Sequence, residues 1–134
     1  MYEVLSITAP HRGLHEMTSE VRRVVGTCGV DDGLCTVFVR HTSASLTIQE
    51  NADPSARRDL EAWIDRQVPS NDPAYTHTVE GPDDMPAHIK AAITATSLTI
   101  PIIAGELALG TWQGVYLWEH RDSPRQRQVI VHVG

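Results

Sequence analysis

Residues 34–41 read LCTVFVRH, and this alternating, β-branched run is the clearest structural signal in the chain. Successive side chains of a strand point to opposite faces, so Cys35, Val37, Val39 and His41 share one face. A face of cysteine and valine has to pack against a core. The run therefore predicts a half-buried strand, with His41 at its end.

Similar signals on both sides of this run predict a sheet of several strands. Alternating or β-branched segments predict strands over residues 2–8, 45–50, 97–103, 107–119 and 126–133. Helical spacing and capping residues predict three helices, which start at Thr18, at Asp53-Pro54 and at Asp84. Because the helices do not alternate regularly with the strands, we expect one α+β domain with mostly antiparallel pairing.

Apolar spacing also predicts which helix faces are buried. The second helix would bury Leu60, Trp63, Ile64 and Val68, and the third would bury Ile89, Ala92 and Ile93. Gly110 and Gly114 interrupt the strand over 107–119, which predicts a bulge or a close approach by another backbone or a ligand. Residues 70–84 form a polar loop long enough to favour a functional role.

Composition limits the class of function. The 134 residues include 11 basic and 17 acidic side chains, for a net charge of −6, and 41% are hydrophobic, enough for one ordinary core. Because nucleic-acid binding depends on clustered Lys and Arg, this charge argues against it. No segment approaches the about 20 apolar residues of a membrane span. Two cysteines, Cys28 and Cys35, fit no disulfide framework and indicate a reducing cytoplasm, and the N-terminus predicts no signal peptide.

The seven histidines are the feature to explain, since common catalytic motifs such as HExxH, GxSxG and the P-loop are missing. His77, Glu80 and His88 lie in or beside the polar loop and offer nitrogen and oxygen ligands for a divalent metal or a phosphate site. The same residues could instead form a solvated acidic loop. His41 is either functional or a strand-end histidine satisfied by a hydrogen bond.

Other polar positions also carry two interpretations. Glu50-Asn51 is a general base with its orienting partner, or it only leads into the following helix cap. Trp112 is more typical of a core than of a ligand platform, and Gln113 suits a wet sheet face as well as a site. We further expect Lys90 to be an exposed charge, and Glu119 and Arg121 to form a cross-strand ion pair.

Three long segments of this sequence resemble the signature segments of the YjbQ family, described as secondary thiamine-phosphate synthase-like proteins. They are HTSASLTIQEN at 41–51, EGPDDMPAHIK at 80–90 and LGTWQG at 109–114, and the resemblance runs nearly end to end. It implies an antiparallel, sandwich-like sheet in a homotrimer with sites near subunit boundaries. It also implies a weak thiamine-phosphate synthase activity, in which hydroxymethylpyrimidine pyrophosphate joins thiazole phosphate. The family residues that match here are His41, Glu50, Asn51, His77, Glu80, His88, Trp112 and Gln113.

From these segments we predict a site with three kinds of residue. His41, Glu50 and His88 are the candidate catalytic residues, and His41, His77, Glu80 and His88 are the candidate metal ligands. The candidate substrate-binding residues are Arg40, Thr42, Ser43, Asn51, Trp112, Gln113 and Arg121. Both proposed substrates are anionic while the chain is acidic, so we expect a divalent cation, Mg²⁺ or Zn²⁺, to mediate binding, with no organic cofactor.

Two alternatives remain open on the sequence. One is a metal-dependent hydrolase or transferase that acts on another phosphorylated metabolite through His41, His77 and His88. The other is a trimeric metabolite-binding protein without turnover. In all three cases the expected partner is a phosphorylated small molecule, with no nucleic acid and no membrane.

Overall fold

The structure is a computed structural model that describes residues 1–134. It has two sheets, and the run at residues 34–41 forms the middle strand of the larger one. That sheet has the strand order β1-β8-β3-β5-β6, and a second sheet has the order β2-β7-β4, with antiparallel pairing throughout. The strands are β1 Tyr2–Ala9, β2 Gly13–Glu16, β3 Gly33–Val39, β4 Ala44–Glu50, β5 Ser97–Ile103, β6 Glu106–Leu107, β7 Gln113–Glu119 and β8 Arg125–Val133. The helices are α1 Thr18–Cys28, α2 Pro54–Gln67 and α3 Asp84–Ile93.

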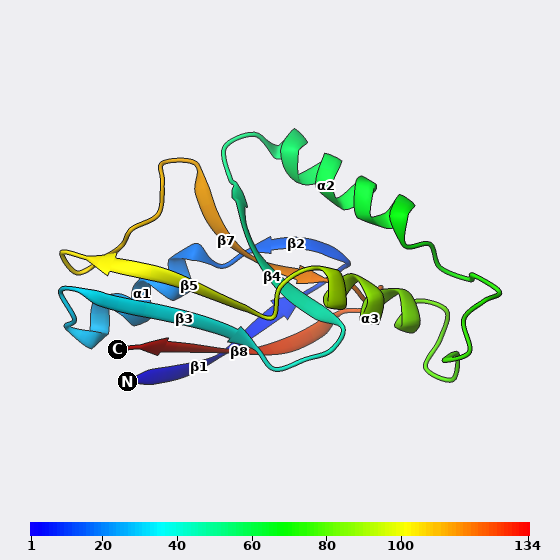
Figure 1. The fold of residues 1–134 in the computed structure, drawn as a ribbon, viewed down its shortest axis with the longest axis horizontal. Helices are drawn as coiled ribbons and strands as arrows, with labels where there is room; N and C mark the ends of the chain where they lie inside the picture. Colours follow the sequence, from blue (N-terminus) through cyan, green and yellow to red (C-terminus); the bar gives the residue numbers. More distant parts are fainter.

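One apolar core joins the two sheets and α1. The inward positions of β3 that the sequence predicts, Cys35, Val37 and Val39, are buried in it together with Val21 and Leu117. The two termini lie side by side (Figure 1), and the Met1 ammonium donates to the Val133 carbonyl at 3.1 Å. The α+β fold of a single chain with antiparallel curled sheets is therefore confirmed. None of the helices is both long and apolar enough to span a bilayer.

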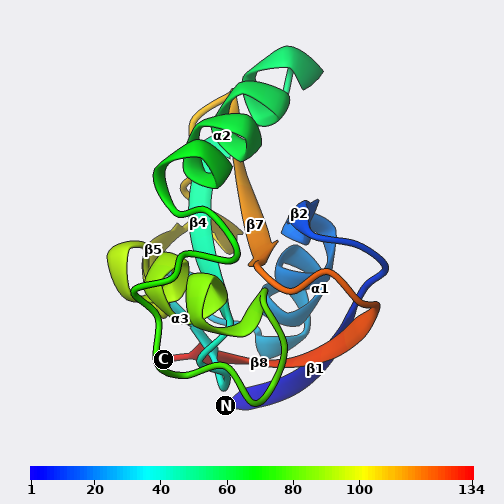
Figure 2. The ribbon, with the colours of Figure 1, turned by 90° about the vertical axis from the view of Figure 1, so that its right-hand side faces the viewer.

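Helix α2 lies on the outside of the molecule next to the sheet β2-β7-β4 (Figure 1 and Figure 2), where its Ile64 clusters with Leu14, Tyr116 and Trp118. Asp53 caps it as predicted, accepting from the Ser55 N–H at 2.9 Å, and Pro54 is its first residue. Within the chain, Ile64 is its only fully buried residue, and Trp63 is 49% exposed. The prediction of a broad buried face on this helix is therefore wrong for Trp63.

The third helix starts where the sequence predicts, but it turns a different face inward. Ala87, Lys90 and Ala91 are buried, whereas Ile93 is 57% exposed, so the predicted apolar face is wrong. The expectation of an exposed Lys90 is also wrong, because its side chain reaches Asp65 of α2 with a nitrogen–oxygen distance of 2.6 Å. A partner for the ammonium is what makes this burial possible.

The predicted strand over 107–119 is two strands. A turn separates β6 from β7, in which the Gly110 N–H donates to the Gln113 side chain at 2.7 Å. At Gly114 a Cβ atom would lie 2.7 Å from Glu16 Oε2, so the close approach expected at this glycine is made by a side chain. The same turn leaves Trp112 63% exposed, which corrects its expected place in the core.

Candidate functional site

His41 follows the end of β3 and uses its ring to fix the neighbouring strand. Its Nε2 accepts the Gln128 N–H at 2.9 Å, and its Nδ1 lies 3.4 Å from the Arg127 guanidinium. Burial, and then the charge of Arg127, lower the pKa of His41 below its ordinary value. The ring is therefore neutral at pH 7, and its accepting nitrogen is already occupied by Gln128.

A buried ion pair supports the segment that follows His41. The Arg127 guanidinium donates to Glu119 Oε1 at 2.6 Å and to the Ser43 hydroxyl at 2.9 Å. Glu119 in turn accepts the N–H groups of His120 and Arg121, each at 3.0 Å. The expected pair between Glu119 and Arg121 is therefore wrong, since Glu119 has Arg127 as its side-chain partner. This ion pair fixes the backbone at two neighbouring chain segments.

A compact group of metal-ligating atoms lies beside that backbone. The Nε2 atoms of His77 and His88 are 2.9 and 3.1 Å from Asp84 Oδ2, and the three ligand atoms lie within 4.8 Å of one another. Asp84 is buried, His88 is partly exposed and His77 is half-exposed. We call His77, Asp84 and His88 the triad.

The backbone orients one imidazole of the triad. His88 Nδ1 lies 2.9 Å from the Thr42 carbonyl, which can only accept, so Nδ1 carries the proton. The carboxylate also only accepts, so the contact of Nε2 with Asp84 Oδ2 at 3.1 Å needs either a second proton on the ring or a cation between the two atoms. A histidine whose second nitrogen donates to a carbonyl is the usual arrangement of a metal ligand.

Arg121 holds the carboxylates of the triad region in place. It donates to Asp84 Oδ1 at 2.7 Å, to Asp83 Oδ2 at 3.0 Å and to the Glu80 carbonyl at 2.9 Å. Burial raises the pKa of Asp83, but hydrogen bonds from Arg121 and the Asp122 N–H outweigh this and lower it below its ordinary value. Arg121 was a predicted substrate ligand. The structure uses its donors on the protein, as a positioning residue.

The remaining predicted residues of this end of the molecule have smaller roles. Thr42 contributes its carbonyl to His88, and Ser43 contributes its hydroxyl to Arg127. Arg40 is exposed, 3.5 Å from the Gln128 amide oxygen. Glu80 and His41 contribute no atom to the triad, and Asp84 takes the place that the sequence analysis gave them.

A second set of predicted residues lies at the other end of β4. The backbone N–H of Asn51 donates to the Trp112 carbonyl at 3.0 Å, and its side-chain amide donates to Glu16 at 3.1 Å. Glu50 pairs with Gln113 across β4 and β7. The seven residues of β4 span about 23 Å at about 3.3 Å per residue. The predicted site is therefore divided between the two ends of this strand, the triad at one and the Glu50 to Gln113 set at the other.

Comparison with known proteins identifies the family of the chain. The family model "YjbQ: UPF0047 protein YjbQ-like" matches residues 3–134. The chain belongs to the YjbQ family.

Its relatives are similar over nearly their whole length. It is 57% identical to the UPF0047 protein sll1880 of Synechocystis over 98% of this chain and 89% of the relative. It is 43% identical to YjbQ of Escherichia coli O157:H7, over 96% of this chain and 93% of the relative. These names describe no activity.

Solved structures of the family have the same fold. An uncharacterized YjbQ/UPF0047 family protein from Clostridium acetobutylicum is 40% identical, covers 100% of this chain and 99% of its own, and superposes with a TM-score of 0.87. The hypothetical protein APE1520 from Aeropyrum pernix is 30% identical, with 98% of each chain covered and a TM-score of 0.86.

Asp84 and Arg127 were not among the site residues predicted from the sequence. Asp84 lies four residues before His88 on a helix, a spacing that brings two side chains together and could have revealed it. Arg127 occupies an inward position of β8, in the row with Val129, Val131 and Val133. A charged residue in such an apolar row indicates a buried partner. The identity of that partner depends on strand pairing, which the sequence leaves open.

Proposed function

We propose that the protein is a metal-assisted transferase for phosphorylated small molecules, of the thiamine-phosphate synthase type. One observation carries the proposal: two imidazole nitrogens and one carboxylate oxygen of the triad lie within 4.8 Å of one another. Two histidines and a carboxylate are the ligand set of several catalytic zinc sites, which keep a fourth position open. His41 and Glu80 are not part of this proposed metal site.

A divalent cation held by the triad would supply the positive charge that neutralises a departing pyrophosphate. The chain contributes the positioning. Arg121 fixes Asp84, and the Thr42 carbonyl sets the proton of His88 on Nδ1. In the synthase reaction the bond between the pyrimidine methylene carbon and the pyrophosphate oxygen breaks, and its electron pair stays on pyrophosphate. The lone pair of the thiazole nitrogen then forms the new carbon–nitrogen bond.

We further propose that the two ends of β4 act together only between copies of the chain, in a homotrimer. One small ligand cannot contact both the triad and Gln113 of the same copy across about 23 Å. A neighbouring copy could bring its own Glu50 and Asn51 to the triad. The exposed Trp112, whose carbonyl accepts the Asn51 N–H, lies at this far end of β4 and provides apolar surface for such a contact.

The activity is tested on the purified protein with hydroxymethylpyrimidine pyrophosphate and thiazole phosphate, with Mg²⁺ or Zn²⁺ present. Mass spectrometry should detect thiamine phosphate. His88→Ala should lower the rate by about 100-fold, because a catalytic metal contributes several kcal/mol and 1.36 kcal/mol is tenfold. His132→Ala, an exposed histidine outside the site, should leave it unchanged. No product with either ion would contradict the proposed reaction.

The subunit-boundary proposal has a separate test. His88→Ala and Glu50→Gln each should inactivate the protein. If each site takes one end from each of two copies, mixed trimers of the two variants should regain about a quarter of the sites, since random assembly restores that share. A mixture without activity would show that both ends serve the site of their own copy.

The two imidazoles of the triad also favour a second candidate function, a zinc-dependent hydrolase. Nitrogen-rich ligand sets are typical of zinc, and zinc lowers the pKa of a bound water for hydrolysis. A hydrolase of a phosphorylated metabolite would show zinc-dependent release of phosphate or pyrophosphate in the absence of any acceptor. Tight binding of a metabolite without any product would instead identify a non-catalytic binding protein.

A further inference from the structure

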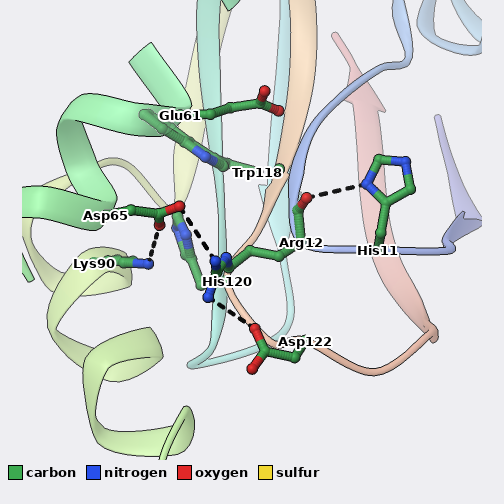
Figure 3. A pocket seen from close by; sticks show the side chains of 9 residues that line it. His11, Arg12, Glu61, Asp65, Lys90, Trp118, His120 and Asp122 are labelled. Carbon is green, nitrogen blue, oxygen red and sulfur yellow. Dashed lines mark hydrogen bonds and ion pairs between the residues drawn. The ribbon is translucent and has the colours of Figure 1, made fainter. Parts of the chain in front are cut away.

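A pocket lies on the other side of α3 from the triad. Lys90 follows His88 by two residues, which places the two side chains on different faces of the helix. The pocket has a volume of about 300 Å³ and is lined by nine residues, of which only Trp118 is hydrophobic. Figure 3 shows side chains from the β1–β2 turn, α2, α3 and the end of β7 converging there. The volume suits a small organic molecule.

The two cations of this pocket are already paired with carboxylates of the same chain. Lys90 Nζ lies 2.6 Å from Asp65 Oδ1, and Arg12 contacts Asp65 Oδ2 at 3.3 Å and Asp122 Oδ1 at 2.8 Å. Both cations therefore have carboxylate partners, as the dashed lines in Figure 3 mark. They are not free to recognise an anion.

The carboxylates of the pocket exceed its cations by one. Glu61, Asp65 and Asp122 face Arg12 and Lys90, so the net charge of these groups is 2 − 3 = −1. Glu61 accepts the Leu14 N–H through Oε2 at 2.7 Å, and its Oε1 has no partner. Asp122 is bonded to Arg12 through Oδ1 only. Two carboxylate oxygens therefore remain for donors from a ligand.

His120 adds a second, independent sign of a ligand. It is 1% exposed and lines the pocket, and its Nδ1 is buried without any hydrogen-bond partner. Its Nε2 lies 2.9 Å from the buried hydroxyl of Ser45. A buried nitrogen without a partner costs about 1–3 kcal/mol, so a native structure is expected to satisfy it with a bound group.

Trp118 forms the apolar wall next to this nitrogen. The indole and imidazole ring centroids are 5.6 Å apart, and Figure 3 shows the Trp118 ring near Glu61 and the His120 ring near Lys90 and Arg12. The face of a tryptophan attracts organic cations. A cationic group with several N–H donors would complement all three features of the pocket. They are the aromatic face, the carboxylate oxygens without a partner and the neutral ring nitrogen.

We propose that this pocket binds a small organic cation, an amine or amidine, with its charged group at Glu61 and its apolar part against Trp118, and that Nδ1 of His120 accepts an N–H group of the ligand. In this arrangement Nε2–H of His120 donates to Ser45, and Nδ1 accepts from the ligand. The pocket is separate from the triad, so occupancy does not require the metal-assisted reaction proposed above.

The probe is acetamidinium, and the readout is the indole N–H signal of each tryptophan in a two-dimensional NMR spectrum of the full chain. Titration should shift the Trp118 signal with a dissociation constant of about millimolar, as expected for so small a ligand. Trp112 is an internal control, because it is 63% exposed and outside the pocket. Sodium acetate and inorganic phosphate should not shift the Trp118 signal.

Glu61→Gln is the matched test of charge, since a glutamine oxygen still accepts the Leu14 N–H. It should weaken acetamidinium binding about tenfold, which corresponds to about 1.4 kcal/mol. Glu106→Gln, an exposed change outside this pocket, should have no effect. A Trp118 signal that does not move, that moves equally with acetate, or that responds identically in Glu61→Gln would overturn the proposal.

Discussion

Among the single residues, Asp84 determines how the triad is arranged. One of its oxygens is bound by Arg121 and the other faces two imidazoles, so the carboxylate cannot rotate without breaking three contacts. Its side chain is only 5% exposed, and in such a position an unpaired charge would be costly. The triad is therefore a built arrangement, with a buried carboxylate at its centre and two more exposed histidines around it.

His120 predicts how the stability of the protein depends on pH. Burial, and then the charges of Lys90, Arg127 and Arg12, lower the pKa of His120 from 6.5 to about 3. The unfolded chain therefore binds a proton below pH 6.5 that the folded chain does not. This contribution to the free energy of unfolding is complete above pH 6.5 and is lost as the pH falls toward 3, by about 1.4 kcal/mol per unit.

Urea denaturation between pH 4 and pH 7 measures this slope, and His120→Gln supplies the comparison. The variant should show a shallower loss of stability on acidification than the original protein, because the buried imidazole is gone. The exposed His132→Ala should retain the full slope. Equal slopes for the original protein and His120→Gln would mean that this ring does not resist protonation.

The ion pair between Arg127 and Glu119 predicts a large effect on stability. Arg127→Met leaves the carboxylate of Glu119 buried without its partner and should cost about 3–5 kcal/mol of unfolding free energy. Combining it with Glu119→Gln should cost less than the sum of the two single changes, by about 0.5–3 kcal/mol. Denaturant titration of the three variants measures the difference. Strictly additive losses would contradict a direct pairing.

Among the helices and strands, α2 is the element least supported by the rest of the chain. With one fully buried residue, it depends on its Asp53 cap more than a packed helix does. Asp53→Ala should cost about 1 kcal/mol and speed hydrogen exchange in the first turn of α2. Asp59→Ala, an exposed change within the helix, is the control. Unchanged exchange in Asp53→Ala would show that other contacts hold the helix start.

The sequence predicted those elements whose pattern is local. The alternation in β3 and β8 and the start signals at Thr18, Asp53 and Asp84 all agree with the structure. The four-residue β2 was missed, because so short a strand has no visible periodicity. The split between β6 and β7 depends on a hydrogen bond from Gly110 to the Gln113 side chain, which a pattern of apolar residues does not reveal.

The candidate site was predictable in part. His77 and His88 were correctly grouped because both lie next to the same polar loop. Asp84 was not singled out among the several carboxylates of the Asp-rich segment, because only the helix direction distinguishes them. Lys90 was placed in solvent because the sequence could not show that Asp65, on a different helix, would meet it. Contacts between distant elements account for most of these errors.

In the molecule as a whole, the acidic net charge limits which ligands the triad can bind. A net charge of −6 repels phosphorylated metabolites, and Arg121 next to the triad already has carboxylate partners. Binding of an anionic substrate there therefore requires an added positive charge. The proposed reaction therefore requires that the triad hold a divalent cation.

Metal stoichiometry tests this claim most directly. The purified protein is equilibrated with Zn²⁺, freed of excess ion by gel filtration and analysed by mass spectrometry for metal per chain, beside His88→Ala and His132→Ala. We predict one ion per chain for the original protein and for His132→Ala, and none for His88→Ala, which lacks a triad ligand. Absence of zinc from the original protein, or equal zinc in His88→Ala, would contradict the account.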